Sequence, residues 1–340
     1  MNDSRTGNPV LVLAADEGFA MPLAVTVRSV LDTANPKRPL TFYILDGGIS
    51  SATKQRLLKS WETPQPHRFE WVTVTAEAFT GIETVGHVNH MTYYRILIPR
   101  VLPEHVQRAI YLDADLIVRR DVCELWDLGT GDELCMAVQD PAAPFIDASQ
   151  VLKNVERSGP YLAALRPILN FEALRLPPDQ PYFNGGVLVM NVARWRQEDL
   201  PQQLIDCLYN NKEFVVWWDQ YALNVVLCGL WTPIDMRWNQ GSHIFLFPGW
   251  EESPLDASTF ERLRNDPFIV HFTSPVKPWQ LQCRHPYRQE WYRCLKKTDW
   301  RGWRPRGSDL VSTLSRAGYQ LCRAGYHLCR AGYRRIRSYL

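Results

Sequence analysis

The sequence lacks a segment that would span a membrane, a secretory signal, and the cysteine patterns of zinc fingers and disulfide frameworks. Its 340 residues contain no run of about 18 apolar residues, so we expect no transmembrane helix. The N-terminal residues MNDSRTGNP hold no apolar stretch of the kind that a secretory signal needs. The eight cysteines form no C-x-x-C pair, which excludes the common zinc-finger patterns and indicates a protein of the reducing cytoplasm.

Several nucleotide-binding and catalytic motifs are also missing. No G-x-G-x-x-G follows the first apolar segment and no G-x-x-x-x-G-K-[ST] occurs. The sequence therefore lacks the motifs that best identify dinucleotide oxidoreductases and P-loop kinases. No G-x-S-x-G sequence marks a hydrolase elbow. The sequence is rich in aromatic residues, at 12% with 13 tryptophans, which is typical of sugar-binding and membrane-surface proteins and also of well-packed cores.

Charge is divided unevenly along the chain. Residues 301–340 hold nine arginines and one aspartate, whereas residues 1–300 hold 29 basic and 35 acidic groups. The tail is therefore basic and the body acidic, which indicates an anionic partner for the tail. We expect this partner to be an anionic membrane surface and not nucleic acid, because the acidic body would repel a nucleic acid.

The tail also repeats with a period of seven residues. The segment 314–319 (LSRAGY) recurs at 321–326 and at 328–333 as LCRAGY. Seven residues are about two helical turns, so leucine and tyrosine share one face of a helix and arginine lies opposite. The pattern predicts an amphipathic helix that lies on the membrane through residues 310–340. A coiled coil and a helix packed on the body are the alternatives.

Strand and helix patterns alternate through the body. Short apolar runs predict strands, and segments with a helical period lie between them. The expected strands are 9–16, 40–45, 69–74, 108–112, 187–190 and 268–272, and the expected helices are 21–31, 52–61, 92–97 and 217–228. This order predicts an α/β fold with a mainly parallel, doubly wound sheet. Residues 1–300 are expected to form one catalytic domain that contains an irregular insertion at 141–178, followed by the tail at 301–340.

Two aspartates follow one of the expected strands. Asp113 and Asp115 are separated by Ala114, and alternate residues of an extended chain point to the same side. Two carboxylates at the carboxyl end of a strand suit Mg²⁺ or Mn²⁺ bound to a diphosphate. The pattern Asp-x-Asp alone is also common on exposed surfaces.

Other polar residues stand beside expected strands and helices. His271 offers a nitrogen ligand that suits Mn²⁺ better than Mg²⁺, or is a hydrogen-bonded structural residue. Lys277 is a compact cation for a phosphate, or an ordinary surface lysine. Gly185 and Gly186 let a ligand approach the backbone and Asn184 offers it a donor and an acceptor, or the segment forms a β-turn. Asp219 belongs to a site, or is the N-cap of a helix.

In their order along the chain, these motifs resemble those of the family 8 glycosyltransferases. These are retaining sugar-nucleotide enzymes that include bacterial lipopolysaccharide galactosyl- and glucosyltransferases and glycogenin. The resemblance runs over about residues 10–279. It rests on Ala14-Ala15-Asp16, Tyr94-Arg95, 111–115 (YLDAD), 182–186 (YFNGG), Asp219-Gln220, Arg237-Trp238-Asn239 and 271–279 (HFTSPVKPW). It implies a GT-A fold, a UDP-sugar donor and Mn²⁺, with Mg²⁺ as the alternative ion.

The resemblance also implies a role for each matching residue. The implied set is Asp113, Asp115 and His271 for the metal; Lys277 for the diphosphate; Ala14, Asp16 and Phe19 for the uridine; and Arg95, Asp113, Ala114, Asn184, Gly185, Asp219 and Gln220 for the phosphate and donor sugar. Gln220 and Asp219 are the expected catalytic residues. Retention requires either a nucleophile, for which Asp219 is the better candidate, or same-face attack with the Gln220 amide stabilising an oxocarbenium-like state.

Three positions depart from the family pattern. Ser274 stands where H-x-x-G-x-x-K-P-W has glycine, Tyr221 stands where D-Q-D has its second aspartate, and Phe19 stands where tyrosine is more usual. Phe19 could still stack on uracil, but it offers no hydroxyl. These departures indicate an altered donor preference or a reduced turnover, with the fold unchanged.

The resulting hypothesis is a metal-dependent transferase that moves galactose or glucose from a UDP-sugar to a lipid-linked glycan at the inner face of a membrane. Galactose and glucose differ at one hydroxyl, and no motif in the sequence indicates which of the two sugars is bound. The insertion 141–178 is the expected acceptor side, where Phe145, Tyr161 and Phe171 stack on sugar rings or pack inside the domain. The alternatives are a metal-dependent phosphohydrolase that uses Asp113 and Asp115, and a membrane-associated glycan-binding scaffold with a weakened active site.

Overall fold

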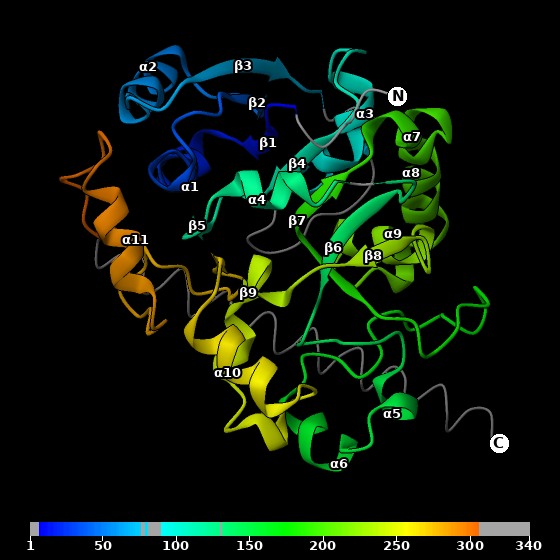
Figure 1. The fold of residues 1–340 in the computed structure, drawn as a ribbon. Coiled ribbons are helices and arrows are strands. Elements are labelled where there is room, and N and C mark those ends of the chain that lie inside the picture. Colours follow the sequence, from blue (N-terminus) through cyan, green and yellow to red (C-terminus); the bar gives the residue numbers. More distant parts are fainter. Residues whose placement is uncertain (1–6, 76–78, 81–89, 130, 306–340) are drawn as a thin grey trace.

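The computed structural model describes residues 7–75, 79–80, 90–129 and 131–305, so the predicted amphipathic helix at 310–340 lies outside the described residues. Within them, strands and helices alternate along the chain (Figure 1). The strands are β1 (Val10–Ala15), β2 (Leu40–Asp46), β3 (His67–Thr73), β4 (Ala109–Leu112), β5 (Leu116–Val118), β6 (Cys135–Gln139), β7 (Phe183–Met190), β8 (Trp231–Pro233), β9 (Gln240–Gly241) and β10 (Ile269–His271).

The α-helices and short 3₁₀ helices occupy the connections. The α-helices are α1 (Ala20–Thr33), α2 (Ser51–Ser60), α3 (Ile98–Val101), α4 (Val122–Asp127), α5 (Ala148–Val151), α6 (Val155–Ser158), α7 (Val192–Gln197), α8 (Leu200–Asn210), α9 (Trp218–Val226), α10 (Ala257–Asn265) and α11 (Arg288–Leu295). The 3₁₀ helices are η1 (Glu17–Phe19), η3 (His90–Leu97), η4 (Gly159–Tyr161), η5 (Lys212–Phe214), η6 (Met236–Asn239), η7 (Ser242–Phe245) and η8 (Trp250–Glu252). No helix in the described part of the chain has the length and apolar character needed to cross a bilayer.

A seven-stranded sheet in the order β3-β2-β1-β4-β7-β6-β8 forms the centre of the molecule. Neighbours among β3, β2, β1 and β4 are parallel, and so are β6 and β8. Strand β7 runs antiparallel to both β4 and β6. The predicted α/β class with a mainly parallel sheet is therefore confirmed. A second sheet, in the order β5-β10-β9, continues from the carboxyl end of β4.

The central strands are apolar on both faces because helices cover both faces. In β1, Leu11 and Leu13 belong to one buried cluster and Val12 and Ala14 to another. Alternate residues of a strand point to opposite sides, so the two clusters lie on the two sides of the sheet. Helices α1 and α11 contribute to the first cluster, and α8 and α9 contribute to the second (Figure 1).

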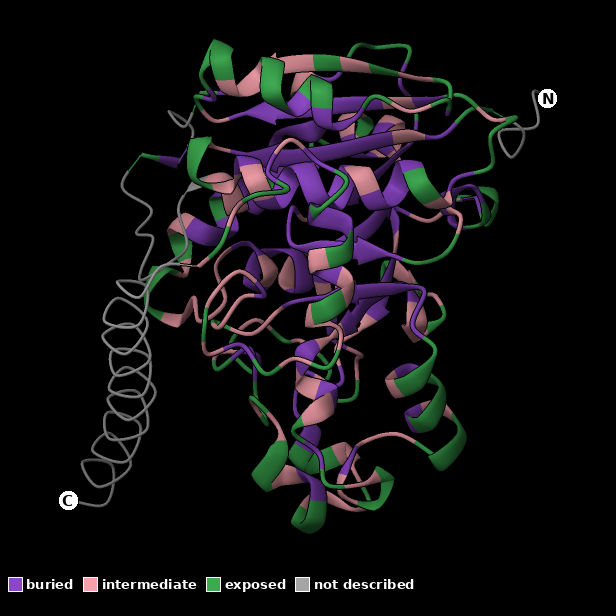
Figure 2. Cartoon of the chain, turned by 90° about the vertical axis from the view of Figure 1, so that its left-hand side faces the viewer, coloured by how far each residue is buried: buried purple, intermediate pink, exposed green. Residues whose placement is uncertain are grey.

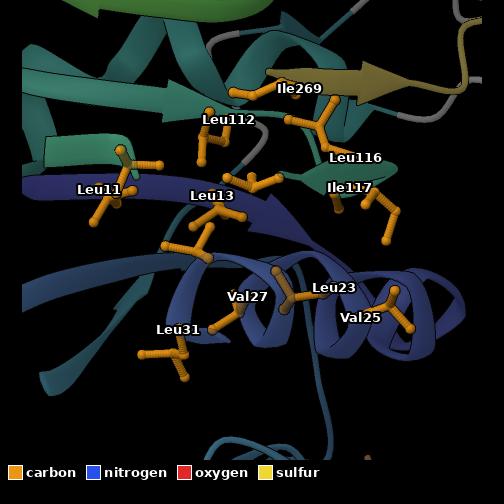
Figure 3. Close-up of a cluster of buried hydrophobic side chains, with 14 of the residues drawn as sticks. Leu11, Leu13, Leu23, Val25, Val27, Leu31, Leu112, Leu116, Ile117 and Ile269 are labelled. Carbon is orange, nitrogen blue, oxygen red and sulfur yellow. The ribbon is translucent and has the colours of Figure 1, made fainter. Parts of the chain in front are cut away.

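The first cluster joins the two sheets. Figure 3 shows side chains of α1 and β1 gathered with those of β4, β5 and β10. Leu13, Leu23, Leu112, Leu116 and Ile269 are all fully buried there. Full burial of such a side chain contributes about 1.5–3 kcal/mol, so this cluster fixes the second sheet against the first. In Figure 2 the buried strands form the interior and the exposed residues lie on the outer helices and loops.

The sequence pattern predicted β1, β2, β3, β4 and β7 and the helices α1, α2 and α9, but it missed the helices α8, α10 and α11. Strands β5, β6, β8 and β9 were not predicted, and the expected strand at 268–272 exists as β10 but belongs to the small sheet. The expected helix at 92–97 is the 3₁₀ helix η3. The insertion 141–178 is not wholly irregular, because it contains α5, α6 and η4.

Candidate active site

Strand register places the three predicted metal ligands together. Strand β4 ends at Leu112 and β5 begins at Leu116, so Asp113 and Asp115 lie in the connection between the two sheets. Strand β10 pairs antiparallel with β5 and sets its last residue, His271, opposite Leu116. The backbone N–H of Phe272 then donates to the carbonyl of Asp115 at 3.2 Å. The pairing of β10 with β5 in the small sheet therefore fixes His271 beside Asp115.

The three side chains converge on one point. Nε2 of His271 lies 3.3 Å from Oδ1 of Asp115 and 3.6 Å from Oδ2 of Asp113. The ligand atoms of all three residues lie within 4.8 Å of one another. Donor atoms that bind one ion at about 2.1 Å in octahedral geometry lie about 3 Å apart, so this spacing fits a divalent cation. Two carboxylates and one imidazole suit Mn²⁺ and, less well, Mg²⁺.

A second set of side chains orients His271. Its Nδ1 donates to Oδ1 of Asn239 at 2.9 Å, which leaves the Nε2 lone pair facing the carboxylates. Nδ2 of Asn239 donates to Oδ1 of Asn184 at 2.9 Å, and the same oxygen accepts the backbone N–H of Gly186 at 3.0 Å. The sequence pattern gave Asn239 no role. Its place in the matching motif Arg237-Trp238-Asn239 was the signal that could have indicated one.

Gly186 allows β7 to approach the metal ligands. A Cβ atom at this position would lie 2.2 Å from Cε1 of His271 and 2.9 Å from Oδ2 of Asp113. The carbonyl of Gly186 also accepts the backbone N–H of Asp113 at 2.9 Å. Any side chain here would therefore displace His271 or break the ladder, so the glycine is a requirement of the site.

Arg95 joins two carboxylates beneath the metal ligands. From η3 its guanidinium contacts Asp113 at 2.8 Å and Asp219 at 2.9 Å, donates to the carbonyl of Gly185, and lies over the ring of Tyr111. Burial alone would lower the pKa of Arg95, but the two carboxylates raise it above its ordinary value. Arg95 was expected to approach the phosphate or the donor sugar; in the structure its charge is already paired.

Asp219 is buried and fully engaged. Its Oδ1 accepts the hydroxyl of Thr92 at 2.5 Å, and its Oδ2 contacts Arg95. Burial raises the pKa of Asp219, against the lowering effect of Arg95 and Thr92. Asp219 is not the N-cap of a helix, because α9 begins at Trp218 with Trp217 as its N-cap. That alternative interpretation of the sequence is wrong, and the carboxylate instead positions Arg95.

Lys277 lies beside Asp115. Its Nζ donates to Oδ2 of Asp115 at 2.7 Å and to the carbonyl of Phe272 at 2.5 Å. Burial alone would raise the pKa of the Asp115 carboxyl, but the charge of Lys277 holds it well below its usual range. Asp115 is therefore ionised at neutral pH, as a metal ligand must be.

A cleft of about 950 Å³ opens in front of these residues, which is within the size range of small-molecule sites. The predicted site residues that line it are Arg95, Asp113, Asp115, Asn184, Asp219, Gln220, His271 and Lys277. Gln220 also accepts the backbone N–H of Gly185 on Oε1 at 3.2 Å, which holds the amide against β7. The structure thus brings the predicted metal, phosphate and sugar residues to one cavity.

The predicted uridine residues lie outside this lining. Ala14 is the last but one residue of β1 and is buried, and Asp16 caps η1 by accepting the backbone N–H of Phe19 at 2.9 Å. The ring of Phe19 meets the edge of Trp279 at 5.9 Å between centroids. Ala114 is buried, and its carbonyl accepts the hydroxyl of Thr26 at 2.8 Å. These residues lie at the carboxyl ends of β1 and β4, but the cleft does not reach them.

The insertion contributes small residues to the cleft. Pro141, Ala142, Ala163 and Ala164 line it. The aromatic residues expected to stack on sugars do not: Phe145, Tyr161 and Phe171 are absent from the lining. Phe171 is packed in the core and Tyr161 is exposed on the surface.

Two of the departures from the family pattern have simple structural roles. The hydroxyl of Ser274 accepts the backbone N–H of Val276 at 3.3 Å, so it stabilises the turn that leads to Lys277. Tyr221 is fully buried and donates to Oδ1 of Asn170 at 2.7 Å, which ties α9 to the insertion. The tyrosine is thus part of the core and not of the cleft.

Comparisons with known proteins agree with this geometry. The family model of glycosyl transferase family 8 matches residues 10–283. General stress protein A of Bacillus subtilis is 28% identical over 298 residues, which cover 85% of this chain and 94% of that relative. The lipopolysaccharide 1,3-galactosyltransferase of Salmonella typhimurium is 23% identical over 292 residues, covering 84% of this chain and 77% of that enzyme.

Solved structures show the same fold. Galactosyltransferase LgtC, in complex with donor and acceptor sugar analogs, matches with a TM-score of 0.69 at 24% identity, covering 86% of this chain and 99% of LgtC. Glycosyltransferase GlyE of Streptococcus pneumoniae matches with a TM-score of 0.61 at 21% identity, covering 87% of this chain and 62% of GlyE. The likeness confirms the predicted GT-A fold.

Proposed function

Because the chain belongs to glycosyl transferase family 8, and is therefore a glycosyltransferase, we propose that it moves galactose or glucose from a UDP-sugar to a glycan acceptor with retention of configuration. The observation that carries the proposal is the convergence of Asp113, Asp115 and His271 at the mouth of a sugar-sized cleft. The hydrogen bond from His271 to Asn239 supports it, because it directs Nε2 to the carboxylates.

The three ligands would hold Mn²⁺, with Mg²⁺ as the alternative. When bound, such an ion supplies positive charge that stabilises the UDP leaving group. Lys277 would add to this charge by exchanging its contact with Asp115 for a diphosphate oxygen. Its Nζ is 2.7 Å from that carboxylate and lines the same cleft, so a short movement of the flexible lysine stem is enough.

The sugar would lie between β7 and α9. Asn184 and Gln220 line the cleft there and offer amide groups to sugar hydroxyls. Both oxygens of Asp219 are engaged by Thr92 and Arg95, which disfavours this residue as a nucleophile. We therefore favour same-face attack, in which the Gln220 amide dipole stabilises positive charge at the reacting carbon and Arg95 fixes Asp113 from below.

The acceptor would enter along the insertion 141–178, whose small residues Pro141, Ala142, Ala163 and Ala164 line the cleft. A lipid-linked acceptor is supported by the similarity to a lipopolysaccharide galactosyltransferase. We propose that residues 1–300 form the transferase domain and that residues 310–340 hold it peripherally at the inner, cytoplasmic face of an anionic membrane, as their basic repeats indicate.

The test is release of UDP from a panel of UDP-sugars with Mn²⁺. The wild type should release UDP from one or two donors, and Asp115→Asn should lose at least a hundredfold of that rate. Asp206→Asn on the exposed face of α8 is the matched control and should keep it. Phosphate release from simple esters at a comparable rate would favour a phosphohydrolase, and absence of both UDP release and UDP binding would favour a scaffold.

A further inference from the structure

A second cavity, of about 660 Å³, lies at the amino ends of the strands of the central sheet, whereas the candidate active site lies beyond the carboxyl end of β4. Its lining includes Val10, Leu40 and His67, which are the first residues of β1, β2 and β3, and Arg108, which precedes β4. The metal ligands follow the carboxyl end of β4. At about 3.3 Å per residue, the six residues of β1 separate the amino and carboxyl ends of the strands by roughly 20 Å.

Unpaired hydrogen-bond donors gather in this cavity. Arg108 is only 7% exposed, and none of its nitrogens Nε, Nη1 and Nη2 has a hydrogen-bond partner among the described residues. Its guanidinium stacks on Trp126 at 3.8 Å from the ring centroid, and Nε1 of Trp126 is also buried without a partner in this part of the chain. An unsatisfied buried donor destabilises the folded state, because it has lost its hydrogen bonds to water without replacement. All of these groups donate and none accepts, so what they lack is an acceptor.

The charge of Arg108 is also only partly compensated. Asp127 is the nearby carboxylate, but Arg38 holds it with contacts of 2.7 and 2.8 Å. Burial lowers the pKa of Arg108, and the charge of Arg38 lowers it further against the opposing effect of Asp127. Arg68 adds a second cation to the rim of the cavity.

We propose that Arg108 and Trp126 bind a small molecule through an oxyanion group, either a phosphate or a carboxylate, at a site separate from the active site. A guanidinium presents a planar fork that two oxygens of such a group can bridge, and the indole N–H can donate to the same group. The cavity is much larger than one ion and has apolar walls at Val10, Leu40 and Val106, which suits an organic remainder. This inference does not depend on the sugar donor of the transferase.

The test is calorimetric titration of the full chain in EDTA at constant ionic strength. The probes are orthophosphate, glucose 6-phosphate and acetate, with glucose as the neutral control. At least one anionic probe should bind, and Arg108→Gln should weaken that binding at least tenfold. Trp126→Phe keeps the ring and removes one donor, so it should weaken binding about threefold. Stronger binding of the phosphates or of acetate identifies the group that the site accepts.

Two controls keep the result specific. The active-site cleft also attracts phosphate through Lys277, so the titrations are repeated with Lys277→Gln, which should retain the Arg108-dependent binding. If Arg108→Gln fails to fold, Trp126→Phe and Arg68→Gln, at an exposed rim residue, provide the test in its place. Equal affinity of these variants and the wild type would overturn the proposal. So would no binding of any anion by the wild type up to about 10 mM, since bound water would then satisfy the donors.

Discussion

His271 donates a hydrogen bond of 2.9 Å from Nδ1 to Oδ1 of Asn239, and this contact turns Nε2 toward Asp113 and Asp115. Asn239 is itself held by its 2.9 Å bond to Asn184, which lines the sugar side of the cleft. The metal ligands and the proposed sugar site therefore share one chain of hydrogen bonds. A substitution at the metal ligands should therefore alter binding at the proposed sugar site, and the reverse should also hold.

The first prediction concerns Asn239. Replacement Asn239→Leu removes the acceptor for Nδ1, so the imidazole loses its fixed orientation and tautomer. The concentration of Mn²⁺ needed for half-maximal UDP binding should rise about 10–100-fold. Asn239→Asp keeps an acceptor for Nδ1 and should lose less. Identical Mn²⁺ titrations for Asn239→Leu and the wild type would refute the orienting role.

A second prediction concerns the close approach of β7 to the ligands. Gly186→Ala places a methyl group 2.2 Å from Cε1 of His271, so the folded protein should lose Mn²⁺-dependent UDP binding and about 1–3 kcal/mol of stability. Gly241→Ala is the matched control, because its Cβ would meet Oγ1 and Cγ2 of Thr273 at the ordinary contact distances of 3.4 and 3.6 Å. Thermal melting and UDP titration of both variants make the comparison. Equal loss in both would show that the effect is not specific to His271.

The third prediction concerns the buried ion pairs of Arg95. Arg95→Met leaves Asp113 and Asp219 without a counter-charge, and should lower the free energy of unfolding by about 3–5 kcal/mol. Adding Asp219→Asn removes one of the orphaned charges and should recover part of the loss. Urea unfolding of the two single variants and the double variant measures the coupling. Simple addition of the two single losses would contradict the pairing.

The fourth prediction concerns the pH dependence of stability. His285 packs between the rings of Phe245 and Phe272, and burial lowers its pKa to about 4. The unfolded chain binds this proton near pH 6.5 and the folded chain near pH 4, so stability should fall as the pH drops through this window. The contribution is about 2 kcal/mol after solvent screening.

His285→Phe should remove this contribution. The free energy of unfolding, measured by urea titration at several pH values between about 7 and 4, should vary less in the variant than in the wild type. Other groups titrate in the same range, so the comparison rests on the difference between the two proteins. A slope unchanged by the substitution would show that folding does not shift the pKa of His285.

The parts of the site that the sequence predicts are those that follow strands. Asp113, Asp115 and His271 stand just after or at the end of apolar runs, and chain order alone places such residues at a sheet edge. The convergence of these three side chains depends on the pairing of β10 with β5, which no pattern in the sequence indicates. Strands β5, β9 and β10 have only two or three residues each, which is too short for a periodic pattern.

The residues that hold the proposed metal ligands in place were hard to predict for a different reason. The ion pair of Arg95 with Asp219 joins η3 to α9 across 124 positions of the chain, and it depends on how both elements pack against β7. Asp219 at the start of a helical segment carried the same local signal as an N-cap. Tertiary contact, and not local sequence, decided its role.

The most direct test of the central claim is calorimetric titration of UDP with and without Mn²⁺, in the wild type and in His271→Ala. If Asp113, Asp115 and His271 hold a divalent cation that binds the diphosphate, the wild type should bind UDP at least tenfold more tightly with Mn²⁺ than in EDTA. His271→Ala should lose most of that difference. Equal UDP affinity in all four experiments would contradict the metal site on which the proposed function rests.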